Sequence, residues 1–256
     1  MKSVIRCTAG LLALATLVAA QTSLENTGKP MRLPFDCTET DTQLAGLSCS
    51  EEEPCAVYLE LSGVEAVGNK IFLTGNLHTS TTTLYSILLV TEDTGKTWSE
   101  AHPRIRFGGL DQIQFIDFQN GWISGANLQS TPRDPFLLLT TDGGKTWHQR
   151  AIYDETRVAV IERFWFESRD NGFLLMDARL EANRHEFYET MTGGESWALK
   201  QASAAPIPFP RAKQSGPSGW RLRPDAATRS NDLEKLEGER WLKVSGFLVN
   251  IGSCKQ

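Results

Sequence analysis

Residues 140–147 read TTDGGKTW, and this stretch decides the fold because the chain repeats it. Residues 91–98 read TEDTGKTW and residues 190–197 read TMTGGESW. The tryptophans that close the three stretches are 49 and 50 residues apart along the chain. A fixed period of about 50 residues is typical of a protein built from copies of one supersecondary unit.

Each unit can be divided into four strands. Residues 113–118 alternate apolar and polar side chains, which predicts a half-buried strand. Asn120-Gly121 then predicts a turn into a second strand, because both residues tolerate positive φ. Residues 136–141 predict a third strand, and Asp142-Gly143-Gly144 a turn into a fourth that Trp147 begins. We therefore expect an all-β fold, a small β-propeller of four to five four-stranded blades.

The repeated stretches contain three kinds of structural residue. The aspartate carboxylate can accept hydrogen bonds from backbone N–H groups of its own turn, and glycine permits the tight turn. The tryptophan ring can be buried between adjacent sheets. In the third stretch Thr192 stands where the aspartate belongs. The expected structural residues are Asp93, Gly95, Trp98, Asp142, Gly144, Trp147, Gly194 and Trp197.

These stretches, together with the Asn120-Gly121-Trp122 feature before the second one, resemble Asp-box (BNR) repeats. Such repeats occur in sialidases, in sortilin-like receptors and in the photosystem II stability and assembly factor family, and the chain looks most like the last of these over residues 64–245. The resemblance implies a propeller that serves as a binding or assembly scaffold. It does not imply a photosynthetic host.

The N-terminus predicts a signal peptide over residues 1–20. Lys2 and Arg6 precede a short apolar run that ends in Val18-Ala19-Ala20. We expect cleavage after Ala20, a disulfide-bearing segment over 21–54 and the propeller domain over 55–256. The exported chain would be periplasmic or extracellular, without a membrane span. It would keep 24 basic and 31 acidic residues, a formal charge of −7 that disfavours nucleic acid as a partner.

Four cysteines remain after cleavage, and an even number in an exported protein predicts two disulfides. The candidates are Cys37, Cys49, Cys55 and Cys254. Three connectivities are open, and any complete pairing ties the C-terminus to the N-terminal segment. A zinc site is the competing interpretation, but no C-x2-C spacing or nearby histidine supports it.

Catalytic motifs are absent. Gly144-Lys145-Thr146 lacks the earlier glycine of a phosphate-binding loop, and the four histidines show no metal-ligand spacing. A sialidase would need an arginine trio, a tyrosine nucleophile and an Arg-Ile-Pro motif before the first box; Arg104-Ile105-Arg106 follows that box and does not match. The sequence therefore predicts no catalytic residues, no metal and no cofactor.

A ligand is expected on the propeller face opposite the box turns, where the loops 76–83, 126–135 and 177–186 would lie. These loops supply the candidate binding residues Arg133, Arg179, Arg184 and His185. One hypothesis is a basic face for a carboxylate-rich or phosphorylated protein partner. The other is that nearby carboxylates simply balance these charges. The leading function is a non-enzymatic binding or assembly scaffold, and the alternative is a glycan-binding or sialidase-like glycoside hydrolase propeller.

Overall fold

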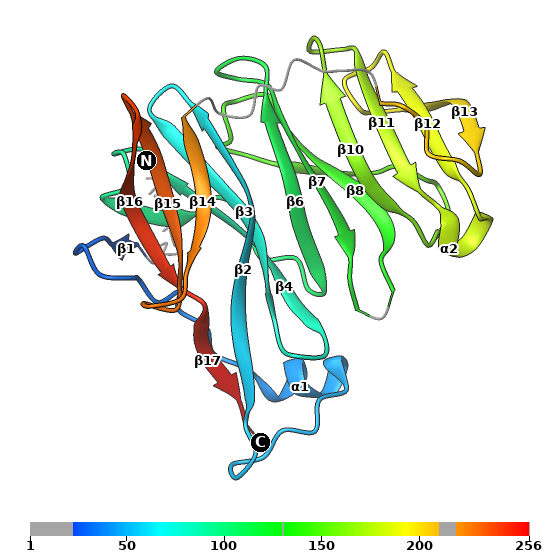
Figure 1. Cartoon of the computed structure of the whole chain (residues 1–256). Coiled ribbons are helices and arrows are strands. Elements are labelled where there is room, and N and C mark those ends of the chain that lie inside the picture. Colours follow the sequence, from blue (N-terminus) through cyan, green and yellow to red (C-terminus); the bar gives the residue numbers. More distant parts are fainter. Residues whose placement is uncertain (1–22, 130, 210–218, 256) are drawn as a thin grey trace, which may run out of the picture.

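The computed structural model describes residues 23–129, 131–209 and 219–255, and within them the strands form four antiparallel sheets. The expected signal peptide lies outside the described residues. The sheets stand side by side in a row, with β14–β16 at one end and β10–β13 at the other (Figure 1). Among the described residues no helix is long and apolar enough to cross a membrane. The fold is thus all-β and propeller-like.

The first sheet has six strands in the order β1-β5-β4-β3-β2-β17. Their bounds are β1 Leu24–Glu25, β2 Cys55–Val67, β3 Lys70–His78, β4 Thr83–Thr91, β5 Thr97–Glu100 and β17 Asn250–Cys254. The second sheet consists of β6 Gly108–Phe115, β7 Gly121–Asn127, β8 Arg133–Thr140 and β9 His148–Ala151. The third consists of β10 Val160–Phe166, β11 Gly172–Asp177, β12 His185–Thr190 and β13 Ala198–Ser203. The fourth consists of β14 Trp220–Asp225, β15 Ser230–Glu237 and β16 Arg240–Leu248. The two helices are α1 Glu39–Ala45 and α2 Arg179–Ala182.

The sheets differ in size from the four-stranded blades that the sequence predicts. Only the second and third sheets have four strands. The first gains β1 and β17 from the two ends of the described chain, and the last has three strands. The added strands pair with partners far away in sequence, which a local repeat pattern cannot indicate.

Side-chain to backbone hydrogen bonds hold the turns of the repeated stretches. Oδ1 of Asp93 accepts from the backbone N–H groups of Lys96 at 3.0 Å and Thr97 at 2.9 Å. Asp142 repeats this arrangement in the second sheet. In the third sheet Oγ1 of Thr192 accepts from the N–H of Ser196 at 3.0 Å, so a hydroxyl replaces the carboxylate.

The tryptophans after these turns join neighbouring sheets. Trp98 is fully buried, packs edge-on against Phe247 of β16 at 5.3 Å between ring centroids, and donates from Nε1 to Oγ of Ser245 at 3.1 Å. Trp147 packs in the same way against Phe72 of β3. Each of these two rings therefore lies between two sheets.

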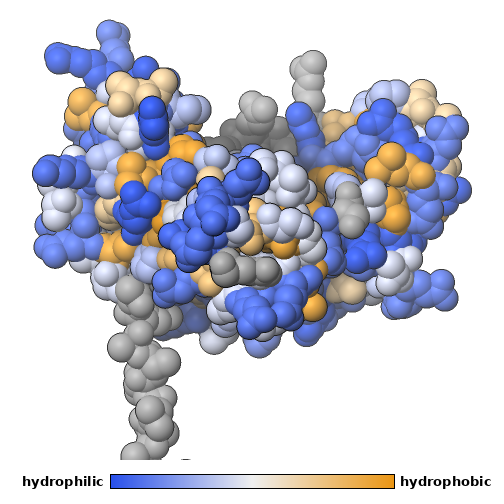
Figure 2. All heavy atoms as spheres, turned by 90° about the horizontal axis from the view of Figure 1, so that it is seen from below, coloured by the Kyte–Doolittle hydropathy of each residue, from blue (hydrophilic) through white to orange (hydrophobic). Residues whose placement is uncertain are grey.

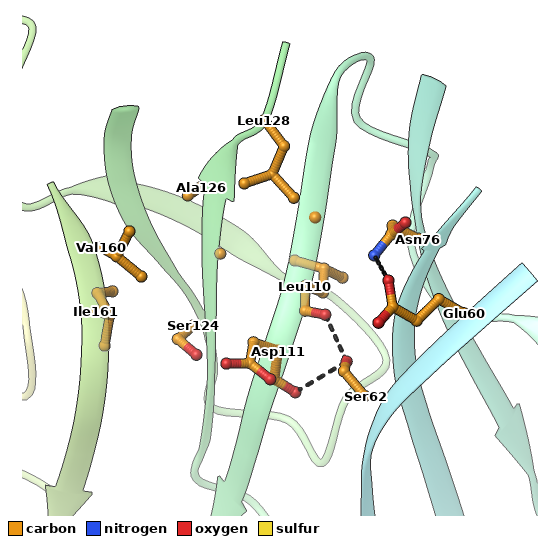
Figure 3. Close-up of a pocket in the computed structure, with 12 residues that line it drawn as sticks. Glu60, Ser62, Asn76, Leu110, Asp111, Ser124, Ala126, Leu128, Val160 and Ile161 are labelled. Carbon is orange, nitrogen blue, oxygen red and sulfur yellow. Dashed lines mark hydrogen bonds between the residues drawn. The ribbon is translucent and has the colours of Figure 1, made fainter. Parts of the chain in front are cut away.

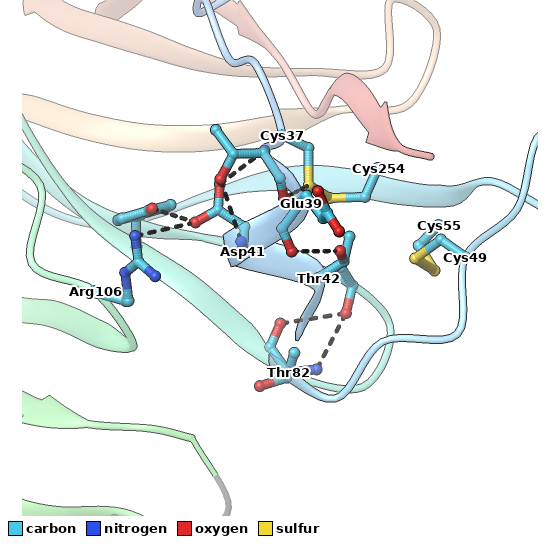
Figure 4. The surroundings of a disulfide bond; sticks show 12 residues. Cys37, Glu39, Asp41, Thr42, Cys49, Cys55, Thr82, Arg106 and Cys254 are labelled. Carbon is cyan, nitrogen blue, oxygen red and sulfur yellow. Dashed lines mark hydrogen bonds and ion pairs between the residues drawn. A yellow bond between two sulfur atoms is a disulfide. The ribbon is translucent and has the colours of Figure 1, made fainter. Parts of the chain in front are cut away.

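Two disulfides flank α1, and one of them connects the C-terminal strand to the N-terminal segment. They join Cys37 to Cys254 and Cys49 to Cys55 (Figure 4). The pairing ties the C-terminus to the N-terminal segment, as all three possible cysteine connectivities would. It also places α1 beside β17 at the end of the molecule that carries the β3–β4 turn (Figure 1).

Helix α1 was not expected from the sequence, although its start carries a recognisable signal. Oγ1 of Thr38 accepts from the N–H of Asp41, and the Asp41 carboxylate accepts from the N–H of Thr38, which is a capping box. The hydroxyl of Tyr85 donates to the same carboxylate, and Arg106 lies 3.4 Å from it. These contacts fix α1 against β4.

Candidate functional site

The loops opposite the box turns lie at one end of the sheets, and Figure 2 looks onto this end. The structure brings Arg179, Arg184 and His185 together at the end of the third sheet. Arg133 begins β8 in the second sheet. Blue and orange side chains alternate over the face in Figure 2, so no single broad patch of one kind covers it.

The arginines of the third sheet already have carboxylate partners. Arg179 lies 2.6 Å from Asp177, and Arg184 lies 2.7 Å from Glu186. Arg157, on the connection between β9 and β10, lies 3.3 Å from Glu186. Arg133 forms no ion pair with any described residue. The positive charge at this end is therefore largely balanced within the protein.

Glu186 is the centre of this cluster and is 0% exposed. Besides the two arginines, its carboxylate accepts from the hydroxyls of Tyr188 at 2.6 Å and Tyr153 at 3.1 Å. Burial by itself would raise the pKa of Glu186, but the hydrogen bonds from Tyr188, Arg184 and Arg157 outweigh it and hold the pKa below its usual value. A fully hydrogen-bonded buried carboxylate of this kind stabilises the fold around it.

A pocket of about 210 Å³ lies between strands of the first three sheets (Figure 3). Strands β2, β3, β6, β7 and β10 all contribute to its lining. One wall is apolar and the other carries carboxylate, amide and hydroxyl groups (Figure 3). The apolar side chains are Leu110, Ala126, Leu128, Val160 and Ile161.

Hydrogen bonds hold the polar wall in place. Oγ of Ser62 donates to the carbonyl of Leu110 at 2.6 Å, and Nδ2 of Asn76 donates to Oε2 of Glu60 at 3.1 Å. Oγ of Ser124 accepts from the N–H of Gln112 at 3.0 Å. The backbone of β6 is thereby fixed to β2 on one side and to β7 on the other, so the pocket is formed in advance of any ligand.

Two carboxylates of the polar wall, Glu60 and Asp111, have no cationic partner. Neither forms an ion pair with any residue that the structure describes. Burial and then the negative charge of Glu60 raise the pKa of Asp111. The pocket thus holds uncompensated negative charge, in contrast to the balanced loop end of the third sheet.

Sequence reasoning missed this pocket, although the repeat contains a signal for it. Glu60, Asp111 and Glu162 follow one another at intervals of 51 residues on the first strands β2, β6 and β10 of three successive sheets. Asp111 and Glu162 stand at irregularities of their strands, and Glu60 stands two residues before the irregularity of β2. An acidic residue recurs at one position of the unit. Comparing the three copies outside the box would have revealed it.

A further carboxyl on β2 lies within the fold. Glu65 is 8% exposed and forms no hydrogen bond or ion pair with any described residue. Burial raises its pKa from the usual 4.5 to about 8. The group is therefore largely protonated at neutral pH, as expected for a buried carboxyl without a charged partner.

No family model and no curated protein matches the sequence. Among solved structures, the chain is similar to YCF48 from Cyanidioschyzon merolae, with 15% identity and a TM-score of 0.39 over 73% of this chain and 59% of that one. A structure of YCF48 bound to a D1 peptide matches with 17% identity and a TM-score of 0.37 over 76% and 54%. An α-L-arabinanase of Penicillium chrysogenum complexed with arabinobiose matches with 13% identity and a TM-score of 0.41 over 87% and 66%.

YCF48 is a photosystem II assembly factor, and these structures are β-propellers that match most of this chain. The match in turn spans only about half to two thirds of their own chains.

Proposed function

We propose that the chain is an exported, non-enzymatic binding scaffold that receives a positively charged side chain of a protein partner in the pocket between its first three sheets. The observation that carries the proposal is the pair of carboxylates, Glu60 and Asp111, that no described cation neutralises. A lysine or arginine of a partner would supply the missing charge. Its aliphatic stem would lie against Leu128 and Val160 on the apolar wall.

Export is part of the proposal. Two disulfides fit an oxidising compartment. The predicted signal peptide over residues 1–20 would direct the chain there.

The loop arginines have a secondary role in this proposal. Arg179 and Arg184 are held by carboxylates of their own sheet. Arg133 has no such partner among the described residues and stands on the sheet that contributes Asp111 to the pocket. It would contact an acidic residue of the partner beside the cationic one, which adds specificity more than affinity.

A glycan-binding or glycosidase function is the second candidate, and one observation favours it. A carboxyl whose pKa is raised next to another carboxylate is the arrangement that glycosidases use for an acid and its companion. Asn76 and Ser124 in the same pocket could bond sugar hydroxyls.

The two candidates are separated by presenting the mature chain to a peptide array and a glycan array, with fluorogenic glycosides as substrates. We expect retention of peptides that contain lysine or arginine, and at least about tenfold weaker retention by the double variant Glu60→Gln/Asp111→Asn. The control Glu195→Gln/Glu237→Gln removes two exposed carboxylates away from the pocket and should bind as the wild type does. Retention of glycans, or turnover of a glycoside that the pocket variant loses, would replace the scaffold by the second candidate.

A further inference from the structure

Three side chains with metal-binding atoms converge on the third sheet, on the face that also carries Phe173 and Phe187. Asp177 at the end of β11 is paired directly with His185 at the start of β12. Glu162 projects beside them from the irregularity in β10. One ligand atom from each of the three lies within 4.8 Å of the other two. The three adjacent strands β10, β11 and β12 thus supply two carboxylates and one imidazole.

The imidazole of His185 is the unusual member of this cluster. The residue is 4% exposed, and its Nδ1 atom has no hydrogen-bond partner among the described residues. Nδ1 nevertheless lies 3.2 Å from Oε1 of Glu162. A buried nitrogen of this kind is costly unless a proton or a metal ion occupies the space between it and the carboxylate.

Comparison of the repeats shows how this cluster arose within the fold. In the first sheet Asn76, near the end of β3, pairs with Glu60 as Asp177 pairs with Val160 in the third, and its amide donates to the Glu60 carboxylate. In the third sheet the corresponding place near the end of the second strand holds Asp177, which can only accept when ionised. The third copy has therefore replaced a donor by a second carboxylate and has added an imidazole.

We propose that Glu162, Asp177 and His185 bind a divalent transition-metal ion, with Zn²⁺ as the best fit. Zn²⁺ accepts nitrogen and carboxylate oxygen ligands, whereas Mg²⁺ and Ca²⁺ prefer oxygen alone. Two ligands at about 2.1 Å in a tetrahedral site are about 3.4 Å apart. The 3.2 Å separation of Nδ1 and Oε1 is close to this value, and a small movement of the Asp177 carboxylate would complete the set.

The guanidinium of Arg179 would compete with a metal ion for the Asp177 carboxylate. Arg179 donates from Nε to Oδ1 of Asp177 at 2.9 Å and from Nη2 to Oδ2 at 2.6 Å. Its side chain is 56% exposed, so it can turn into solvent when the metal binds. Metal binding would then release a guanidinium at the loop end, and removal of Arg179 should strengthen metal binding.

The test uses the tag-free mature chain after chelation, titrated with Zn²⁺ by calorimetry and with Co²⁺ by absorption spectroscopy. We expect one ion per chain and an intense four-coordinate Co²⁺ spectrum. Glu162→Gln should weaken Zn²⁺ binding at least about tenfold and His185→Asn at least as much. Arg179→Gln should tighten binding. Glu189→Gln, a control on the same sheet, should leave binding unchanged.

Glu162→Gln is the decisive variant because its side chain is 30% exposed and the change keeps its shape, so the fold should persist. Equal Zn²⁺ affinity of the wild type, Glu162→Gln and Glu189→Gln would overturn the proposal. So would a Co²⁺ spectrum that Glu162→Gln does not alter. Neither outcome bears on the pocket of Glu60 and Asp111, so the proposed function is tested separately.

Discussion

Cys55 and Cys254 face each other directly across β2 and β17, yet each forms its disulfide with a different cysteine. Cys254 bonds to Cys37, 217 residues away, and Cys55 bonds to Cys49, six residues away. The two bonds therefore close loops of very different length at the same place in the fold. Their contributions to stability should differ accordingly.

Removing the long-range disulfide should destabilise the protein more than removing the short one. In the chain-entropy account, a bond that closes a loop of this length contributes about 5 kcal/mol, and one across six residues about 2 kcal/mol. We expect Cys37→Ser/Cys254→Ser to lower the midpoint of urea unfolding by more than Cys49→Ser/Cys55→Ser. Equal losses would show that native contacts around α1, and not loop closure, determine the effect.

The buried Glu65 should make stability fall as the pH rises. Its pKa is about 8 in the folded chain and near 4.5 when unfolded, so between these values the folded state binds more protons. The stabilisation is complete below about pH 4.5 and is lost as the pH rises through about 8, by roughly 5 kcal/mol.

Glu65→Gln, which keeps the shape and cannot ionise, should remove this fall. Urea unfolding of both proteins at several pH values measures it, with Glu237→Gln as an exposed control. A wild-type profile that Glu65→Gln leaves unchanged would contradict the prediction.

The carboxylate of Glu186 should contribute far more to the stability of the fold than the carboxylate of Glu181. Glu186→Gln would leave Arg157 and Arg184 without their buried counter-charge, and we expect a loss of about 3 kcal/mol in the free energy of unfolding. Glu181→Gln removes an exposed partner 3.7 Å from Arg157 and should cost less than about 1 kcal/mol. Chemical denaturation of the two variants decides the point, and comparable losses would argue against a central role for Glu186.

The threonine at position 192 of the third repeated stretch predicts that Asp142 of the second can be replaced by threonine at small cost in stability. Thr192 accepts a turn N–H through its hydroxyl, as Asp142 does through its carboxylate. Asp142→Ala removes these hydrogen bonds and should cost about 1–2 kcal/mol. Asp142→Thr should cost clearly less, since the hydroxyl can take over one of them. The prediction fails if urea midpoints fall equally for the two variants.

Much of the local structure could be predicted from the sequence. The third strand of the second unit was expected over 136–141 and is found at Arg133–Thr140. The box turns and the burial of Trp98 were predicted for the same reason, because turn residues and alternating side chains act over a few residues.

Longer-range features could not be predicted in this way. The pairing of β17 with β2, the choice among cysteine connectivities and the three-stranded last sheet depend on contacts between distant segments. The pocket could be predicted from the sequence only in part. Glu60 and Asp111 recur at the repeat spacing, but only the packing of neighbouring sheets shows that both line one pocket.

The bond between Cys37 and Cys254 makes almost the whole described chain a covalent ring. A single cut by a protease anywhere between these two cysteines would open the ring and release no fragment, because both pieces remain joined through sulfur. In an extracellular setting the molecule could be nicked in a surface loop and still keep its sheets together. Such a nicked form would run as one species on a gel without reductant and separate into two only when the disulfides are reduced.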